Sequence, residues 1–478
     1  MSLISHERKY TGRVINLDID LVRFPDGRTG VFPHLLDRYK PGVIGVLSNG
    51  KRFTNESNSY HDVGAAMIEA CAQLPETAMW LVCDRRALGK YGLGYVKPAP
   101  LPIGGFTAKD AIPIDPPGLT PLVPANHRSP FSRGSQDLPS DLTPIKPEVL
   151  FEAGNMLVDG ADYCGIHPAV SLLALSSDVE NEPLMPFNAT SAAAGVAGNF
   201  TGQLQAELPD LWPETYRALM VDSATWPQPI RSQLVGRGAH WKSISKGKRQ
   251  LILRDVGYGV PDLERAFRSA RNDVTLIAQA EIQPFAAGPN GQAPVFNEMH
   301  FYDLPWPSAL LQELENETVT LKVTLSYFIE PNLSGRAATR PDTYRSFGLR
   351  FEMKKRTETA AGFRRRLTQP RDHDEPTANE GSHWLLGPNA FQAGSLHCDL
   401  WRGAAVDLAS HDEIAVYPVG GWWKSHTGQQ RMNDKGRYAL ILSIDAPGQA
   451  VDLHARIAAM VEAKQAEIQA ALVDATGL

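Results

Sequence analysis

The stretch that decides how this sequence is interpreted is residues 187–197, which read FNATSAAAGVA. Small side chains continue from Ser191 to Leu208, and they predict a helix that can lie close against a sheet. Ser191 then stands in the first turn of that helix, where the dipole is positive and backbone N–H groups lack partners within the helix. Such groups can stabilise an oxyanion. The segment by itself also fits an alanine-rich core helix capped by a serine.

This segment resembles the nucleophile motif G-T-S-x-A-x-x-x-x-A-G of subtilisin-like serine proteases. Ala189 stands where the motif has its first glycine, and residues 198–199 (GN) stand where it ends in A-G. Upstream, residues 129–134 (SPFSRG) and 145–150 (IKPEVL) resemble the family's S-x-F-S-x-G and K-P-D-V-x-A-P-G segments. The resemblance implies a serine endopeptidase lineage in which Ser191 is the catalytic nucleophile.

The resemblance extends over about residues 105–450 and is closest to a bacterial subfamily of large intracellular subtilases with a long C-terminal extension. Further segments that carry it are 213–219 (PETYRAL), 257–262 (GYGVPD), 297–300 (NEMH), 325–332 (LSYFIEPN) and 416–424 (VYPVGGWWK). Membership of this subfamily implies a protein or peptide substrate. Its members are often encoded beside an AAA ATPase, which the resemblance therefore implies as a partner.

The first hundred residues do not fit this family. Residues 45–56 (GVLSNGKRFTNE) resemble the G-x-R-F-x-N-E segment of FAD-dependent dehydrogenases of the fumarate reductase and 3-ketosteroid dehydrogenase type. Residues 8–28 resemble, more weakly, the N-terminal arm of Nudix ADP-ribose pyrophosphatases. We therefore interpret the chain as a mosaic: 1–30 Nudix-like, 31–104 flavoprotein-like, 105–273 the second half of a subtilisin-like catalytic domain, and 274–478 a β-rich C-terminal domain with a terminal helix.

The two N-terminal fragments lack the residues that their families use for chemistry. A flavoprotein holds the FAD pyrophosphate with a G-x-G-x-x-G turn, and residues 92–94 (GLG) lack the third glycine. Nudix chemistry needs a run of glutamates on one helix, which the sequence does not contain. The histidines show no H-E-x-x-H pattern. The sequence thus predicts no cofactor and no metal, and the alternative of a flavin-dependent oxidoreductase fragment rests on residues 31–103 alone.

The subtilisin-like part lacks three motifs that supply the rest of the mechanism. No D-T-G strand end, no H-G-T-x-x-A-G helix start and no S-A-G-N oxyanion segment occurs in the sequence. His34 lies at about the family's spacing from Ser191 but in no such motif, and His61 is the other candidate base. Because a serine without a base stays protonated, we expect a weak or inactive peptidase. The alternative is a non-catalytic interaction protein that uses its C-terminal domain.

The remaining patterns predict an α/β fold followed by a β-rich, sandwich-like C-terminal domain. Proline-rich residues 96–149 predict loops, and Pro213 opens a helix over 213–221. The long alternation at 319–329 needs a partner sheet, which favours a sandwich that folds alone. The charged residues 354–384 predict a solvated loop, and residues 454–473 predict a helix.

Composition excludes several classes of protein. The 47 Lys and Arg against 53 Asp and Glu leave a net charge of −6, which argues against a nucleic-acid or anionic-membrane binder. The 4 cysteines form no C-x-x-C pair, so a disulfide scaffold and a cysteine-rich zinc module are not expected. The sequence shows neither a secretory signal nor an apolar run of about 18 residues. These observations predict a cytoplasmic protein that binds neither membranes nor nucleic acid.

Overall fold

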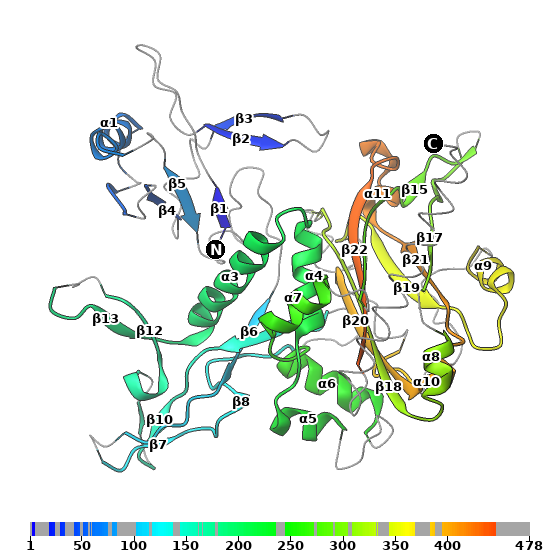
Figure 1. Ribbon diagram of the computed structural model, residues 1–478. Coiled ribbons are helices and arrows are strands. Elements are labelled where there is room, and N and C mark those ends of the chain that lie inside the picture. The colour runs from blue at the N-terminus through cyan, green and yellow to red at the C-terminus, as the bar shows by residue number, and fades with distance from the viewer. Residues whose placement is uncertain are drawn as a thin grey trace, which may run out of the picture. The chain divides into compact units, whose positions relative to one another are not determined.

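Figure 1 shows the computed structural model of the chain, which divides into two compact units, Met1–Pro100 and Leu101–Leu478. The structure describes residues 2–4, 19–23, 29–33, 43–47, 51–55, 58, 60–74, 79–83, 102–113, 117–136, 144–160, 162–164, 166–176, 180–235, 244–271, 275–289, 292–304, 308–330, 332, 344–368, 383–387 and 394–445.

The described part of the N-terminal unit contains a small antiparallel sheet, a hairpin and a helix. The strand order of the sheet is β1 (Ser2–Ile4), β5 (Trp80–Cys83), β4 (Val43–Val46). The hairpin pairs β2 (Ile19–Arg23) with β3 (Thr29–Pro33) in antiparallel register. The helix α1 (Tyr60–Ala70) carries Asp62 in its first turn, where the helix dipole favours a carboxylate.

The second unit begins with a small sheet that supports helix α3. In this sheet β6 (Ile103–Thr107) pairs in parallel with β9 (Val149–Glu152) and in antiparallel with β8 (His127–Arg128). The helix α3 (Ala189–Glu207) packs on β6 and β9, and three of its buried residues are alanines. Small side chains allow the helix axis to approach the sheet, as the sequence predicts for this segment.

Two antiparallel sheets of the second unit pack face to face. The first has the order β14 (Leu276–Ile282), β22 (Gly436–Asp445), β18 (Thr318–Tyr327), β20 (Leu396–Ala404). The second has the order β17 (His300–Asp303), β21 (Glu413–Val419), β19 (Gly348–Met353). Alternate residues of both sheets meet in one apolar core, which is the arrangement of a sandwich. This part of the fold is consistent with the β-rich architecture that the sequence predicts.

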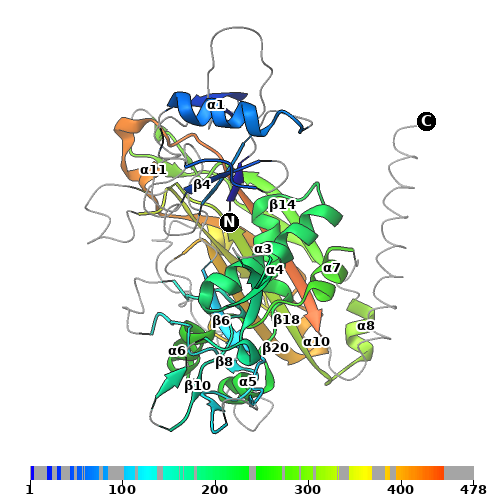
Figure 2. The same cartoon turned by 90° about the vertical axis from the view of Figure 1, so that its left-hand side faces the viewer.

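The opposite face of the four-stranded sheet is covered by helices of the subtilisin-like segment. The helix α4 (Pro213–Ser223) lies on β22 and β18, and every residue from Glu214 to Ser223 is buried. The strand residues Cys398, Leu400 and Ile441 share one apolar core with α3 and α4. In the turned view, α3, α4 and α7 (Leu263–Arg271) lie in front of this sheet (Figure 2). Residues 105–273 and 274–445 therefore share a core.

The outer face of the three-stranded sheet is covered by a helix that the sequence does not predict. The helix α9 (Ala360–Thr368) buries Phe363 and Leu367 against Tyr417 and neighbouring residues of β21. It falls within the charged segment that we expected to form a solvated loop. Its arginines are paired: Arg366 binds Glu358 and Glu352. The charge run thus has an apolar face at helical spacing, and the expectation of a loop is wrong over α9.

The other elements are short or lie at the edges. They are β7 (Thr120–Pro121), β10 (Leu157–Val158), β11 (Tyr163–Cys164), β12 (Leu172–Leu175), β13 (Leu184–Phe187), β15 (Phe285–Ala286), β16 (Val295–Phe296), α5 (Gln228–Val235), α6 (Lys246–Val256), α8 (Ser308–Glu313), α10 (Ala405–Leu408), α11 (Trp422–Ser425) and the 3₁₀ turns Pro168–Val170 and Thr427–Gln429. In the described residues of the proline-rich segment 96–149, the regular elements are thus short strands.

The division into two compact units can be compared with the predicted domain boundaries. The two compact units meet at residue 100, close to the boundary expected after residue 104, whereas both subtilisin-like and C-terminal segments fall in one unit. The boundaries at 30, 104 and 273 stay predictions, because compactness alone does not establish which segments fold separately. The helix expected at 454–473 lies outside the described residues.

Candidate functional site

Ser191 lies exposed in the first turn of α3, two residues after the helix begins. The chain enters the helix through Ala189, whose φ of 66° is in the left-handed region that favours glycine. This is the position at which the resembling family has glycine, so Ala189 adopts the backbone conformation that the motif needs despite its side chain. The Ala189 N–H donates to the carbonyl oxygen of Ala153 over 2.8 Å, which ties the helix entrance to the end of β9.

The turn after β9 is fitted closely to the start of α3. Gly154 has a φ of +78°, and a Cβ added there would lie 3.0 Å from Oδ1 of Asn188 and from the carbonyl oxygen of Val170. The Ser129 hydroxyl donates to the Gly154 carbonyl over 2.6 Å. Ser129, in the segment that resembles S-x-F-S-x-G, therefore contacts the turn after β9 that adjoins the start of the Ser191 helix. This positioning agrees with the resemblance, but the role of Ser191 stays a prediction.

Among the described residues, no hydrogen bond joins a histidine to Ser191. His127 and His383 contact the backbone carbonyls of Ala125 and Arg402 instead. His34 lies outside the described residues, and His61 lies in the first turn of α1 in the N-terminal unit. The part of the chain that the structure describes thus shows no assembled base for Ser191.

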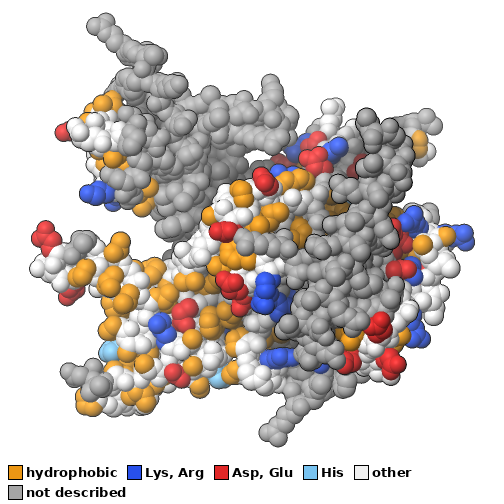
Figure 3. Space-filling model, in the orientation of Figure 1, with side chains coloured by type: hydrophobic (Ala, Val, Ile, Leu, Met, Phe, Trp, Pro, Cys, Tyr) orange, Lys and Arg blue, Asp and Glu red, His pale blue; other side chains and the backbone are white. Residues whose placement is uncertain are grey.

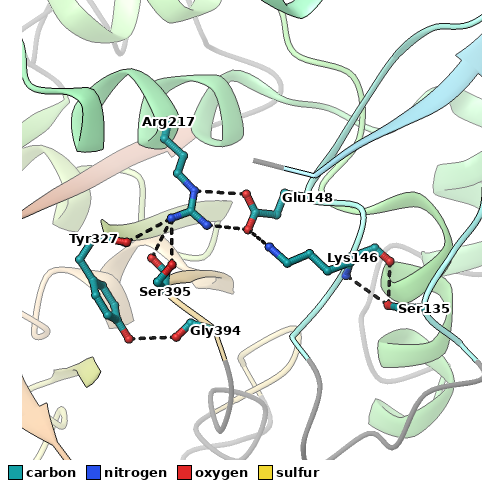
Figure 4. A network of polar contacts seen from close by, with 7 residues as sticks. All are labelled: Ser135, Lys146, Glu148, Arg217, Tyr327, Gly394 and Ser395. Atoms are coloured by element: carbon teal, nitrogen blue, oxygen red, sulfur yellow. Dashed lines mark hydrogen bonds and ion pairs between the residues drawn. The ribbon is translucent and has the colours of Figure 1, made fainter. Parts of the chain in front are cut away.

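A buried ion network connects the subtilisin-like segment with the sandwich (Figure 4). Arg217 of α4 donates from Nε and Nη2 to the two carboxylate oxygens of Glu148, at 3.2 and 2.6 Å. Lys146 binds the same carboxylate. Burial acts to raise the pKa of Glu148, but the charges of Arg217 and Lys146 outweigh it and lower the pKa. Glu148 is therefore ionised at neutral pH and holds both cations.

The remaining nitrogen of Arg217 extends the network into the sandwich. Its Nη1 donates to the carbonyl oxygens of Tyr327 and Ser395, at 3.1 and 3.2 Å, and to the Ser395 hydroxyl at 3.1 Å. The Tyr327 hydroxyl in turn donates to the Gly394 carbonyl over 3.1 Å. In the sequence, Lys146, Glu148 and Arg217 stand out only as parts of segments that resemble subtilases. Their juxtaposition depends on packing between segments far apart in the sequence.

A second buried cation holds the C-terminal end of α4. Nζ of Lys322, from β18, donates to the carbonyl oxygens of Val221, Asp222 and Ala224 at 2.7, 2.8 and 2.9 Å. These are the carbonyls that a helix leaves without partners at its C-terminus, where the dipole also favours a cation. Ser443 donates to the Asp222 carboxylate over 3.0 Å. The network and this cap together fix α4 on the sheet.

The strand β20 carries titratable groups toward the same core. Burial raises the pKa of Asp399 to about 6, although its carboxylate accepts backbone N–H groups of Leu386, Gly387 and Leu400. Burial also raises the pKa of the neighbouring Cys398 thiol to about 12. A thiol with such a pKa is protonated at neutral pH and is a poor nucleophile. Asp399 and Cys398 therefore contribute to the packing and hydrogen bonding of the core, and neither contacts Ser191.

Two sequence-based expectations about partners and cofactors can be compared with the described residues. No group of three or more His, Cys, Asp or Glu side chains there is placed to hold a metal ion. No helix of the described part is long and apolar enough to cross a membrane. The Trp422–Trp423 pair is buried, and both indole nitrogens donate to Glu330. The pair thus packs in the core rather than forming an exposed platform.

The family model that matches this chain describes the subtilase family, peptidase S8, and covers residues 42–259. The match starts well before residue 105 and spans just under half of the chain. It therefore includes His61, which the resemblance left in a flavoprotein-like fragment.

Two curated proteins are similar to parts of the chain. A 4-oxocyclohex-2-ene-1-carboxylate 5-dehydrogenase of Sinomonas cyclohexanicum is 39% identical over 25% of this chain and 24% of its own length. The uncharacterized protein y4bN of Sinorhizobium fredii is 26% identical over 64% of this chain and 63% of its own length. The chain thus spans about a quarter and somewhat under two thirds of these relatives. The assignment of residues 31–104 to a flavoprotein-like fragment stays a prediction beside this dehydrogenase relative.

Two solved structures of an Aeromonas sobria serine protease are also similar, one of them a complex with its chaperone. The complex is 13% identical over 72% of this chain and 64% of that chain, with a TM-score of 0.21. The protease alone is 14% identical over 56% of this chain and 46% of that chain, with a TM-score of 0.15. Such TM-scores establish no shared fold. The subtilase family model matches residues 42–259, so this part of the chain is similar to subtilases.

Proposed function

We propose that this chain derives from subtilisin-like serine endopeptidases, that Ser191 occupies the nucleophile position, and that its peptidase activity is weak or absent. The observation that carries the proposal is the exposed Ser191 hydroxyl in the first turn of α3, directly after the left-handed Ala189. Unpaired backbone N–H groups of a first helical turn can stabilise a developing oxyanion. The family match over residues 42–259 supports the lineage.

The expected weakness follows from the groups that the sequence does not supply in recognisable motifs. Without a general base the serine hydroxyl stays protonated, and without an orienting carboxylate a histidine is not held in the productive tautomer. In subtilisin, loss of the histidine alone lowers kcat by about 10⁶, nearly as much as loss of the whole triad. Backbone donors near Ser191 and substrate binding can supply only the residual rate.

The proposed substrate is a protein or peptide, because the lineage cleaves peptide bonds. We propose an AAA ATPase as a possible functional partner on the basis of the subfamily resemblance only. A cytoplasmic location is part of the same proposal. The net charge of −6 agrees with a protein that does not act on nucleic acid.

Labelling with a fluorophosphonate probe tests the role of Ser191, because the probe reacts with activated serines. We expect faint labelling of the native chain that disappears in Ser191→Ala. The matched control is Ser232→Ala, which removes an exposed helical hydroxyl that donates to the Gln228 carbonyl and accepts from the Gln228 side-chain amide. Labelling that survives in Ser191→Ala would contradict the assignment of the nucleophile.

Turnover of casein or a peptide ester measures the completeness of the site. Rates indistinguishable between native protein and Ser191→Ala are expected for a weak or inactive enzyme. Hydrolysis on the scale of a working serine protease would show that a histidine completes the site. His61→Ala and His34→Ala are then the variants that identify it, and His61 comes first because the family match includes it.

A second candidate is a non-catalytic interaction protein of the same lineage that binds through its C-terminal β-rich region. It predicts no probe labelling at Ser191 at all. The third, a flavin-dependent oxidoreductase fragment, is favoured only by the dehydrogenase relative that is 39% identical over 25% of this chain. Flavin absorbance in the purified protein would support it, and a colourless protein that does not bind added FAD would exclude it.

A further inference from the structure

The hairpin β12–β13, which leads into α3, is apolar on both of its faces. All eight of its strand residues are apolar and none is buried. Leu173, Leu175 and Leu184 are 57%, 79% and 53% exposed. The cross-strand register places these three with Pro186 on one face and the other four residues on the opposite face. A two-stranded hairpin with neither face covered is only marginally stable in water. The exposed apolar side chains of this hairpin are therefore suited to binding a partner.

Acidic side chains lie at one end of the hairpin. Hydrophobic side chains gather over β12 and β13 in the space-filling view, with acidic side chains at the free end of the hairpin (Figure 3). Glu180 and Glu182, which precede β13, are both exposed. A ligand that follows the strands thus meets apolar side chains along its length and negative charge at one end.

The outer edge of β12 has backbone groups that face away from β13. The Ser176 N–H donates to the Pro183 carbonyl over 3.1 Å, which makes these residues a hydrogen-bonded pair. Since such pairs alternate along antiparallel strands, Leu173 and Leu175 direct their N–H and C=O groups outward. On β13 the outward positions are Leu184 and Pro186, and Pro186 has no N–H to donate. The β12 edge is therefore the better template for a further strand.

We propose that the β12 edge binds an extended segment of a partner protein, with alternating apolar side chains and a basic residue that lies near Glu180 and Glu182. Main-chain hydrogen bonds to Leu173 and Leu175 add the segment as a third strand, and the exposed leucines receive its apolar side chains. The basic residue complements the acidic end. This interaction does not depend on peptide hydrolysis and is independent of the function proposed above.

Two other occupants fit the observations less well. An anionic membrane surface would attract basic rather than acidic residues, and the acidic end of the hairpin would approach the head groups. A second copy of the chain brings the same acidic end and the same net charge of −6.

The test measures peptide binding to the full chain carrying Ser191→Ala, so that hydrolysis cannot interfere. The probe is a short fluorescent peptide that alternates valine and threonine and ends in two lysines, and its twin ends in two glutamates. Fluorescence anisotropy is expected to show saturable binding of the lysine peptide that weakens with added salt. The glutamate peptide is expected to bind at least about tenfold more weakly.

Two substitutions locate the site. Leu175→Glu places a charge on the proposed edge and is expected to weaken binding about tenfold or more, and Leu251→Glu introduces the same charge at a leucine of α6 that is 48% exposed. Leu251→Glu is expected to bind as the parent does, and the thermal melts of both variants show whether they are folded. Equal loss in both variants, or no binding of the lysine peptide by the parent, would overturn the proposal.

The same variants identify the other occupants. Sedimentation equilibrium that shows a dimer of the parent, dissociated by Leu175→Glu, would assign the edge to a second copy instead. Co-sedimentation with vesicles of phosphatidylcholine and phosphatidylserine, lost in Leu175→Glu, would assign it to a membrane. Either result overturns the proposed protein partner. Failure of probe labelling at Ser191 leaves all these outcomes unaffected.

Discussion

The two faces of the sheet β14-β22-β18-β20 are covered in different ways. The strand β18 directs the odd-numbered residues from 319 to 327 into the apolar core of the sandwich. Its opposite face presents Lys322, Thr324 and Ser326, all buried beneath helices. An apolar core accepts any packing of suitable volume, whereas a buried ion must meet its partner. Helix α4 is therefore held on the sheet by buried charges as well as by apolar packing, whereas the second sheet meets it through an apolar core.

The largest expected effect comes from removing the helix-covered face altogether. A fragment of residues 274–445 would expose Cys398, Leu400 and Ile441 and leave Lys322 without the carbonyls of α4. The sequence pattern favours a sandwich that folds alone, but the shared core leads us to expect no cooperative thermal melt by circular dichroism, since the central sheet of this fragment loses the core on one side. Residues 101–445, which retain α4, are the control and are expected to melt cooperatively. A sharp melt of the shorter fragment would show that the sandwich face suffices.

Breaking the buried ion network is expected to have the next largest effect. Arg217→Ala leaves the fully buried Glu148 with Lys146 as its only cation in the network, and the free energy of unfolding should fall by about 3–5 kcal/mol in urea titrations. Arg356→Ala, which breaks the exposed pair with Asp407, is the control and should cost at most about 1 kcal/mol. Equal losses in the free energy of unfolding would mean that the buried network contributes no more to stability than an exposed ion pair. The double variant Arg217→Met with Glu148→Leu should recover part of the loss, because it removes both buried charges.

The smallest expected effect is a pH dependence that belongs to Asp399. Its pKa rises from a usual value near 3.8 to about 6 in the folded chain, so protonation favours folding. The stability from this group is complete below pH 3.8 and is lost as pH rises through 6. Asp399→Asn lacks this titration, and its stability relative to the parent should therefore increase between pH 4 and pH 7. The expected change is on the order of 2 kcal/mol in urea titrations at several pH values. A constant difference between the two proteins across this range would show that Asp399 has an ordinary pKa.

Several elements could be predicted from local sequence patterns. The helix from Ser191 onward follows from a run of small residues, and α4 begins at Pro213 because proline suits a first helical turn. The strand β18 follows from the long alternation at 319–329. The strand β20 escaped prediction because it buries His397 and Asp399, and polar residues are normally interpreted as exposed.

For the candidate site, too, local sequence patterns predicted some features and missed others. The sequence pattern located Ser191 at a helix start, because small residues and a hydroxyl in a first turn are local properties. It also predicted a fold that separates the subtilisin-like and C-terminal segments, whereas the shared core joins them in one unit. The two segments are joined by contacts between residues more than a hundred positions apart, such as Arg217 with Tyr327 and Lys322 with Val221, and no local pattern records these contacts.

By itself, the sequence determined the helix that begins near Ser191 and the long strand β18, and it carries the resemblance to subtilases. These depend on residue identity and spacing within short segments. Only the tertiary structure decided that Arg217 meets Glu148 and Ser395, that Lys322 caps α4, and that the β12–β13 hairpin has neither face buried. The physical reason is that burial and charge pairing are properties of the packed chain, and they form only when distant segments come together.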